Sequence, residues 1–164
     1  MFLLMGDDLI LRTHLAYIIA QKLRQIFEQQ GFPEISLKIY YSRVYEVITL
    51  ILKRFHASVS ELICLYVCIC RLESHTDRHD YLNQSELLGV LWIITHKLNE
   101  DAFYSDRLYA RYLSISFAQL RLWQVMILDS INCYVTSREF YRCLSDLYEL
   151  EVRYFGRGIN VPKK

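Results

Sequence analysis

Apolar residues recur at the spacing of an α-helix along most of the chain, starting near its N-terminus. A first run from Leu9 to Gln30 carries Leu and Ile at helical intervals, and Gly31-Phe32-Pro33 ends it. A second run places its apolar residues on one face from Val44 to Phe55. Both stretches therefore predict amphipathic helices that bury one side.

Four capping boxes divide the rest of the chain into further helices. In a capping box the N-cap side chain accepts a backbone hydrogen bond, and an acid or amide three residues later reaches back. Each box opens an apolar run, and strand-like alternation is absent from the sequence, so we predict an all-α protein. The boxes are Ser58-x-x-Glu61, Asn83-x-x-Glu86, Ser116-x-x-Gln119 and Thr136-x-x-Glu139.

The run from Leu62 to Cys70 is apolar on every face, which indicates a helix surrounded by other helices. We therefore predict one five-helix bundle over residues 41–150, with this helix at its centre. The N-terminal helix and its connector, residues 1–40, are expected outside the bundle as an additional element. Residues 151–164 are expected to form a C-terminal tail that is loose from Arg157 to Lys164.

The composition fits a folded domain without strongly charged partners. The chain has 164 residues, of which 53% are hydrophobic and 23% charged, which is enough for a sizeable core. The formal net charge of +1 argues against nucleic acid or an anionic membrane surface as a partner. The apolar runs are shorter than the roughly 20 residues of a membrane span. No secretory signal pattern follows Met1, so we expect the nucleus or cytoplasm.

The five cysteines form an odd set with three members in one apolar run. They are Cys64, Cys68, Cys70, Cys133 and Cys143. This pattern predicts buried, reduced thiols and no disulfide framework. Cys64 and Cys68 share a helix face and could bind metal, but tetrahedral zinc sites usually use two separated ligand pairs. We therefore favour core packing and expect neither a metal nor another cofactor.

No catalytic arrangement stands out, although one segment keeps an enzymatic alternative open. Residues His75, His79 and Asp80 could ligate zinc or act as acid and base, but a solvated loop between helices is the preferred interpretation. The acidic group of Glu100-Asp101 with Asp106 could bind a metal ion, but it lacks the glycine turn and ligand spacing of a calcium loop. A glycine-rich phosphate loop and a Gly-x-Ser-x-Gly nucleophile motif are both missing from the sequence.

The segment from Lys97 to Gln124 joins two apolar runs through charged and aromatic residues. It reads Lys97, Glu100-Asp101, Tyr104, Asp106, Tyr109-Ala110, Leu113-Ser114-Ile115-Ser116 and Gln119-Leu120-Arg121-Leu122-Trp123-Gln124. Without a gap, it resembles the pattern Lys-x-x-Asp-Asp-x-x-Tyr-x-Asn-x-x-Tyr-Ala, Gly-Gly-Ile/Val-Ser, Glu-Leu-Asn-x-Leu-Glu of the phosphate-signalling (P/U-type) cyclins, which have a single cyclin box. The resemblance extends from about Val44 to Leu147.

This resemblance implies a cyclin fold and a non-enzymatic regulatory subunit. A cyclin binds a cyclin-dependent protein kinase and holds its PSTAIRE-like helix inward, so that the kinase can transfer phosphate. The residues expected to bind the kinase are Lys97, Gln124, Asp101, Phe103 and Tyr104, with the first two on one exposed face. Cell division and phosphate signalling are both compatible processes.

Departures from the cyclin pattern include Gln124 and the pair Leu113-Ser114. Gln124 stands where the pattern has Glu, so a charge-assisted hydrogen bond is lost. Leu113-Ser114 replaces Gly-Gly, so a turn that needs positive φ must be made differently. The first departure keeps an alternative open, a cyclin-fold adaptor that binds a transcription factor or scaffold without activating a kinase. The resemblance predicts that Lys97→Glu abolishes kinase binding and that Gln124→Glu preserves or strengthens it.

Overall fold

The computed structural model describes residues 8–29, 43–72, 84–100 and 102–155, and every regular element within these ranges is a helix. The all-α prediction is therefore confirmed for this part of the chain. The elements are α1 (Asp8–Gln29), α-helical residues 43–49 that continue into the π-helix η2 (Leu50–Arg54), α3 (Val59–Leu72), α4 (Gln84–Asn99), α5 (Asp106–Leu113), α6 (Phe117–Ser130) and α7 (Ser137–Phe155).

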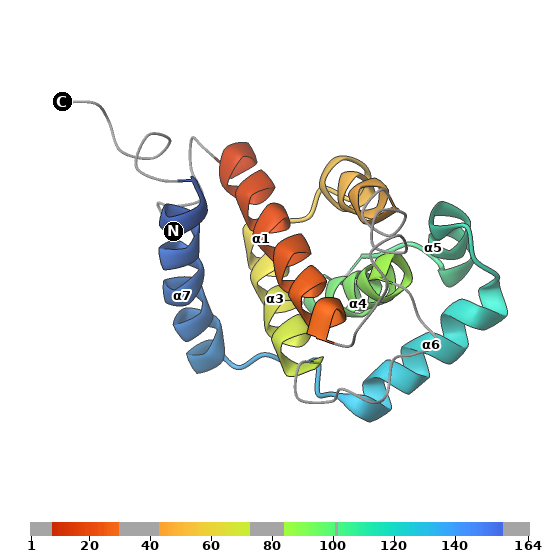
Figure 1. Cartoon of the computed structure of the whole chain (residues 1–164). Helices are drawn as coiled ribbons and strands as arrows, with labels where there is room; N and C mark the ends of the chain where they lie inside the picture. Colours follow the sequence, from red (N-terminus) through yellow and green to blue (C-terminus); the bar gives the residue numbers. More distant parts are fainter. Residues whose placement is uncertain (1–7, 30–42, 73–83, 101, 156–164) are drawn as a thin grey trace.

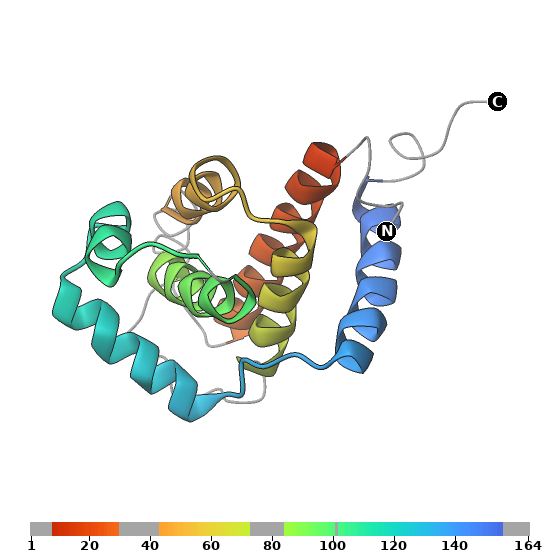
Figure 2. The same ribbon diagram turned by 180° about the vertical axis from the view of Figure 1, so that it is seen from behind.

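Helix α3 lies in the middle of the packing, as its apolar sequence predicted. It contacts α1, α4 and α7, and α4 in turn contacts α5 and α6. Figures 1 and 2 show α7 and α1 on one side of the molecule and α5 and α6 on the other. Trp92 of α4 and Ile69 of α3 are almost fully buried between these two sides. The two halves therefore share one continuous core.

Helix α1, which the sequence placed outside the bundle as an additional element, packs against the bundle and is part of this core. Its residues Ile19 and Leu23 are at most 1% exposed. The helix packs against α3, α4 and α7, and the Arg12 guanidinium donates a hydrogen bond to the Leu52 carbonyl oxygen over 2.9 Å. The apolar period correctly predicted a buried face of α1, and α3 and α7 together cover that face.

The C-terminal helix also extends further than predicted. Helix α7 ends at Phe155, so residues 151–155 are helical where the sequence placed the start of a tail. The buried Glu151 Oε2 lies 2.8 Å from His14 Nδ1 of α1, and the Phe155 ring stacks on the same His14 ring with centroids 3.8 Å apart. These two contacts tie the last turn of α7 to α1. The expected loose segment, residues 157–164, lies outside the described residues.

Three of the four predicted capping boxes are confirmed by their hydrogen bonds. In the first, the Ser58 N–H donates to Glu61 Oε1 over 2.9 Å, and the Glu61 N–H donates to Ser58 Oγ over 3.1 Å. The reciprocal bonds are also present in the boxes that start at Ser116 and Thr136. The box at Asn83 lies outside the described residues. Local sequence thus sets where these helices begin.

Helix α5 was not predicted, because it is short and opens without a capping box. The Ser105 side chain caps it by accepting a hydrogen bond from the Leu108 N–H over 3.3 Å. Ser114 ends the helix in the left-handed region, at φ 58° and ψ 41°. The expectation that this turn is made differently is therefore wrong, because Ser114 itself adopts the positive φ that glycine would favour.

Candidate functional site

Three polar side chains from three helices meet where α4 ends. Lys97 lies in the last turn of α4, Asp106 in the first turn of α5, and Gln124 within α6. The Lys97 ammonium donates hydrogen bonds to the Asp106 carboxylate and, over 3.0 Å, to Gln124 Oε1. Gln124 Nε2 completes the triangle by donating to Asp106 Oδ2 over 3.4 Å. The structure thus brings together two of the predicted residues and adds Asp106.

The triangle is less exposed than the sequence implied. The Lys97 side chain is 25% exposed and that of Asp106 19%, whereas Gln124 as a residue is only 8% exposed. The prediction that Lys97 and Gln124 both lie on an exposed face is therefore wrong for Gln124. This residue turns toward α4 and α5, and its amide also donates to the Leu120 carbonyl oxygen over 3.4 Å.

Aromatic side chains lie beside the triangle at the surface. Phe103 is 51% exposed, and the Lys97 Nζ atom lies 5.8 Å from its ring centroid, within cation–π range. Tyr104 is 43% exposed, and its backbone N–H donates to the Tyr109 hydroxyl over 3.2 Å. Burial raises the pKa of that Tyr109 hydroxyl. The predicted residue Asp101 lies outside the described residues.

Leu98 extends this surface with a large apolar side chain that is 55% exposed. Exposed aromatic and apolar groups around a partly buried charge are typical of protein-binding surfaces. We refer to Lys97, Leu98, Phe103, Tyr104 and Asp106 as the Lys97 surface. Asp106 was not among the predicted binding residues, although its position nine residues after Lys97 and directly after Ser105 was visible in the sequence.

A hydrogen-bonded pair of side chains joins the end of α4 to the start of α3. His96 Nδ1 lies 2.6 Å from Glu61 Oε2, and Glu61 is 3% exposed. The His96 ring also lies against Trp92, with centroids 5.0 Å apart. His96 thus fixes the last turn of α4, from which Lys97 projects, onto the start of α3. Sequence reasoning did not pair these residues, because they are far apart along the chain.

The other candidate residues do not form a second site in the described part of the chain. The Cys64 thiol donates to Asn99 Oδ1 over 3.8 Å, whereas the Cys68 thiol donates to the Cys133 carbonyl oxygen over 3.7 Å. Burial raises the pKa of Cys64 to about 11, which keeps it protonated at neutral pH. Among the described residues, no group of three or more His, Cys, Asp or Glu side chains could hold a metal ion. The segment with His75, His79 and Asp80 lies outside them.

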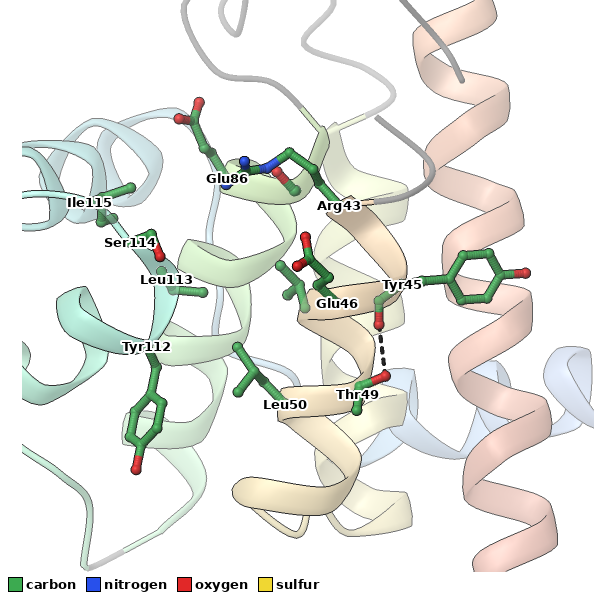
Figure 3. A pocket seen from close by; sticks show the side chains of 12 residues that line it. Arg43, Tyr45, Glu46, Thr49, Leu50, Glu86, Tyr112, Leu113, Ser114 and Ile115 are labelled. Carbon is green, nitrogen blue, oxygen red and sulfur yellow. Dashed lines mark hydrogen bonds between the residues drawn. The ribbon is translucent and has the colours of Figure 1, made fainter. Parts of the chain in front are cut away.

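An open groove of about 600 Å³ lies between residues 43–50 and the end of α5 (Figure 3). Its walls carry the apolar side chains of Leu50 and Leu113, and Glu46 and Arg43 lie at one end. The Tyr45 ring points away from the groove toward α1. The lining combines apolar and charged groups, so the groove offers space in which a ligand or a partner side chain could bind.

Within the described ranges, no helix is both long enough and apolar enough to cross a membrane. Comparisons of the chain with protein families, with curated proteins and with solved structures found no match.

Proposed function

We propose that this chain is a cyclin, a regulatory subunit that binds a cyclin-dependent protein kinase and positions its PSTAIRE-like helix. The observation that carries the proposal is the meeting of Lys97 and Gln124 at the end of α4. They lie 27 positions apart in the sequence, yet both are positions at which the resemblance to the cyclin pattern places kinase-binding residues. In this proposal the chain supplies a binding surface and no catalytic groups.

The chemistry of the Lys97 surface supports a protein partner. The Lys97 ammonium has three donors and uses hydrogen bonds to two acceptors, Asp106 and Gln124, so a third N–H can reach a backbone carbonyl oxygen of a partner. Phe103 and Leu98, each at least half exposed, would lose contact with water when a partner helix covers them. A partly buried cation beside an exposed aromatic ring is an arrangement in which one residue can contribute much of the binding energy.

The proposal is tested by capture of the partner and by its kinase activity. The tagged chain is purified from its own cells, the bound proteins are identified by mass spectrometry, and phosphorylation of a generic substrate is measured in the eluate. We expect a cyclin-dependent kinase in stoichiometric amount, with activity. Recovery of transcription or scaffold proteins without any kinase would overturn the proposal in favour of the adaptor alternative.

A pair of matched variants ties the interaction to the proposed surface. Lys97→Glu reverses the charge at the site, and Lys53→Glu makes the same change at an exposed position in η2. We expect the first variant to lose kinase binding and the second to keep it. Circular dichroism must show that both variants are folded. Equal binding by both folded variants would contradict the assignment of the Lys97 surface.

A further inference from the structure

The triangle of Lys97, Asp106 and Gln124 contains one cation, one carboxylate and one carboxamide. Each corner contacts both others, through the ammonium, the carboxylate oxygens and the amide group. A carboxamide and a carboxylate have nearly the same shape, but the amide has two N–H donors and only one acceptor oxygen. The geometry therefore allows the two groups to exchange places while the total charge stays the same.

The cyclin pattern differs from this chain by such an exchange of carboxylate and carboxamide. The pattern has Asn at the position of Asp106 and Glu at the position of Gln124, so both departures fall on neighbouring corners. One departure adds a carboxylate and the other removes one. Sequence reasoning treated the loss at Gln124 in isolation, because nothing in one sequence shows that the two positions touch.

We propose that Asp106 supplies the carboxylate of this surface in place of Gln124, and that it both positions Lys97 and accepts hydrogen bonds from the partner. The inference rests on the proposed function for its partner-binding half. A carboxylate has about four acceptor directions, of which the contacts with Lys97 and Gln124 occupy two. The remaining directions and the 19% exposure of the side chain leave Asp106 able to meet backbone N–H donors.

The position of Asp106 favours a negative charge there. It lies in the first turn of α5, where the helix dipole and unpaired backbone N–H groups stabilise an anion. Gln124 lies in the middle of α6 and is more buried, so an anion there would be less hydrated and farther from a helix N-terminus. The carboxylate of the triangle thus lies at position 106, where its negative charge is better stabilised than it would be at position 124.

The exchange of carboxylate and carboxamide between positions 106 and 124 predicts a different effect of Gln124→Glu from the one that the sequence alone predicts. Gln124→Glu alone would set a second carboxylate against Asp106, where Gln124 Nε2 now lies 3.4 Å from Oδ2. Asp106→Asn alone would leave Lys97 without its counter-ion. We therefore expect each single substitution to weaken both the fold and partner binding, and the double substitution to restore both. The expectation that Gln124→Glu strengthens binding is replaced by this one.

The test is a double-mutant cycle with two readouts on the full chain. The wild type, Asp106→Asn, Gln124→Glu and the double variant are compared by thermal unfolding and by affinity for the captured cyclin-dependent kinase. We expect each single variant to lose about tenfold in affinity and to unfold at a lower temperature. The double variant is expected to lie within about twofold of the wild type. Asp129→Asn, at an exposed position of α6, is the matched control and should change neither readout.

The outcomes separate this inference from the proposed function. If wild type binds no cyclin-dependent kinase, the proposed function and the partner-binding role of Asp106 are overturned together. The thermal cycle then still decides the charge exchange, which is overturned if the double variant is no more stable than the single ones. Restored stability without restored affinity would overturn the partner contact alone.

Discussion

Glu61 Oε2 lies 2.6 Å from His96 Nδ1, and the other oxygen of the same carboxylate caps α3 by accepting from the Ser58 N–H. One buried side chain therefore fixes both the start of α3 and the last turn of α4. Because Lys97 follows His96 directly, the position of the Lys97 surface depends on this contact.

Removal of this carboxylate should cost more stability than removal of an ordinary cap. We expect Glu61→Ala to lower the free energy of unfolding by roughly 2–4 kcal/mol, since a cap and a buried hydrogen bond are both lost. The comparison variant Glu139→Ala removes the acid of a more exposed capping box together with its ion pair to Arg71, and should cost roughly 1–2 kcal/mol. Urea unfolding followed by circular dichroism measures both. Equal costs would mean that the buried contact with His96 contributes no more than the ion pair between Glu139 and Arg71.

Charge reversal at Lys97 should affect the fold as well as the surface. Lys97→Glu places a carboxylate against Asp106, whereas Lys97→Met keeps the apolar stem and removes only the charge. We expect the reversed variant to unfold at a lower temperature than the methionine variant, by a difference of roughly 1–2 kcal/mol in stability. Thermal unfolding at low and high salt checks this. Repulsion between carboxylates should weaken as salt rises, and an unchanged difference would point to packing as the cause.

Contacts between residues close together in the sequence could be predicted, whereas contacts between helices far apart in the sequence could not. The capping boxes at Ser58, Ser116 and Thr136 involve residues three positions apart, so the sequence alone placed these helix starts correctly. The amphipathic period of α1 predicted a buried face but not what covers it, because α3 and α7 are both far along the chain. A pattern of apolar positions gives the orientation of a helix and not its neighbours.

The site around Lys97 was likewise predicted only in part. The resemblance to a cyclin pattern selected Lys97 and Gln124, and the structure places them 3.0 Å apart at their polar atoms. It did not select Asp106, although this residue contacts both. The role of Asp106 depends on helix α5. This helix has only eight residues, lies between two longer helices and has no capping box from which it could be predicted. A contact that requires an unpredicted element cannot be read from the spacing of motifs.

Ser114 offers a substitution that should stabilise the chain. Its φ of 58° is a left-handed conformation that costs a residue with a side chain roughly 1–2 kcal/mol and glycine little. Its N–H bonds the carbonyl oxygens at the end of α5, so the conformation must be kept. We expect Ser114→Gly to raise the free energy of unfolding by about 0.5–1 kcal/mol after the greater entropy of unfolded glycine is subtracted. Urea unfolding measures the change, and a loss of stability would show that the Ser114 side chain makes a needed contact.

The thiols of Cys64 and Cys143 should be unreactive in the folded chain. Burial raises the pKa of Cys64 from 9.0 to about 11 and that of Cys143 from 9.0 to about 12. The folded chain therefore holds these protons more tightly than the unfolded one, so stability is full below pH 9 and declines as pH rises toward 11. We expect slow alkylation of both residues by iodoacetamide at mildly alkaline pH, measured by mass spectrometry, and fast alkylation in concentrated urea. Fast labelling of the folded chain would contradict the burial of these thiols.

The contact between His14 and Glu151 connects the two ends of the described chain. His14 Nδ1 lies 2.8 Å from Glu151 Oε2, across 137 positions of sequence, and both side chains are at least nine-tenths buried. The Phe155 ring covers His14 at a centroid distance of 3.8 Å, which further limits access of water. The last turn of α7 and the first half of α1 should therefore stabilise one another.

Glu151→Ala tests this coupling directly. The substitution leaves a buried ring nitrogen of His14 without its partner, so we expect the free energy of unfolding to fall by roughly 2–4 kcal/mol. Glu149→Ala removes the same side chain from an exposed position of α7 and should change stability by less than about 0.5 kcal/mol. Hydrogen exchange adds a local readout, because only the first substitution should reduce protection of α1. If both variants matched the wild type, residues 151–155 would behave as the tail that the sequence predicted, and the contact between Glu151 and His14 would add nothing to the stability of α1.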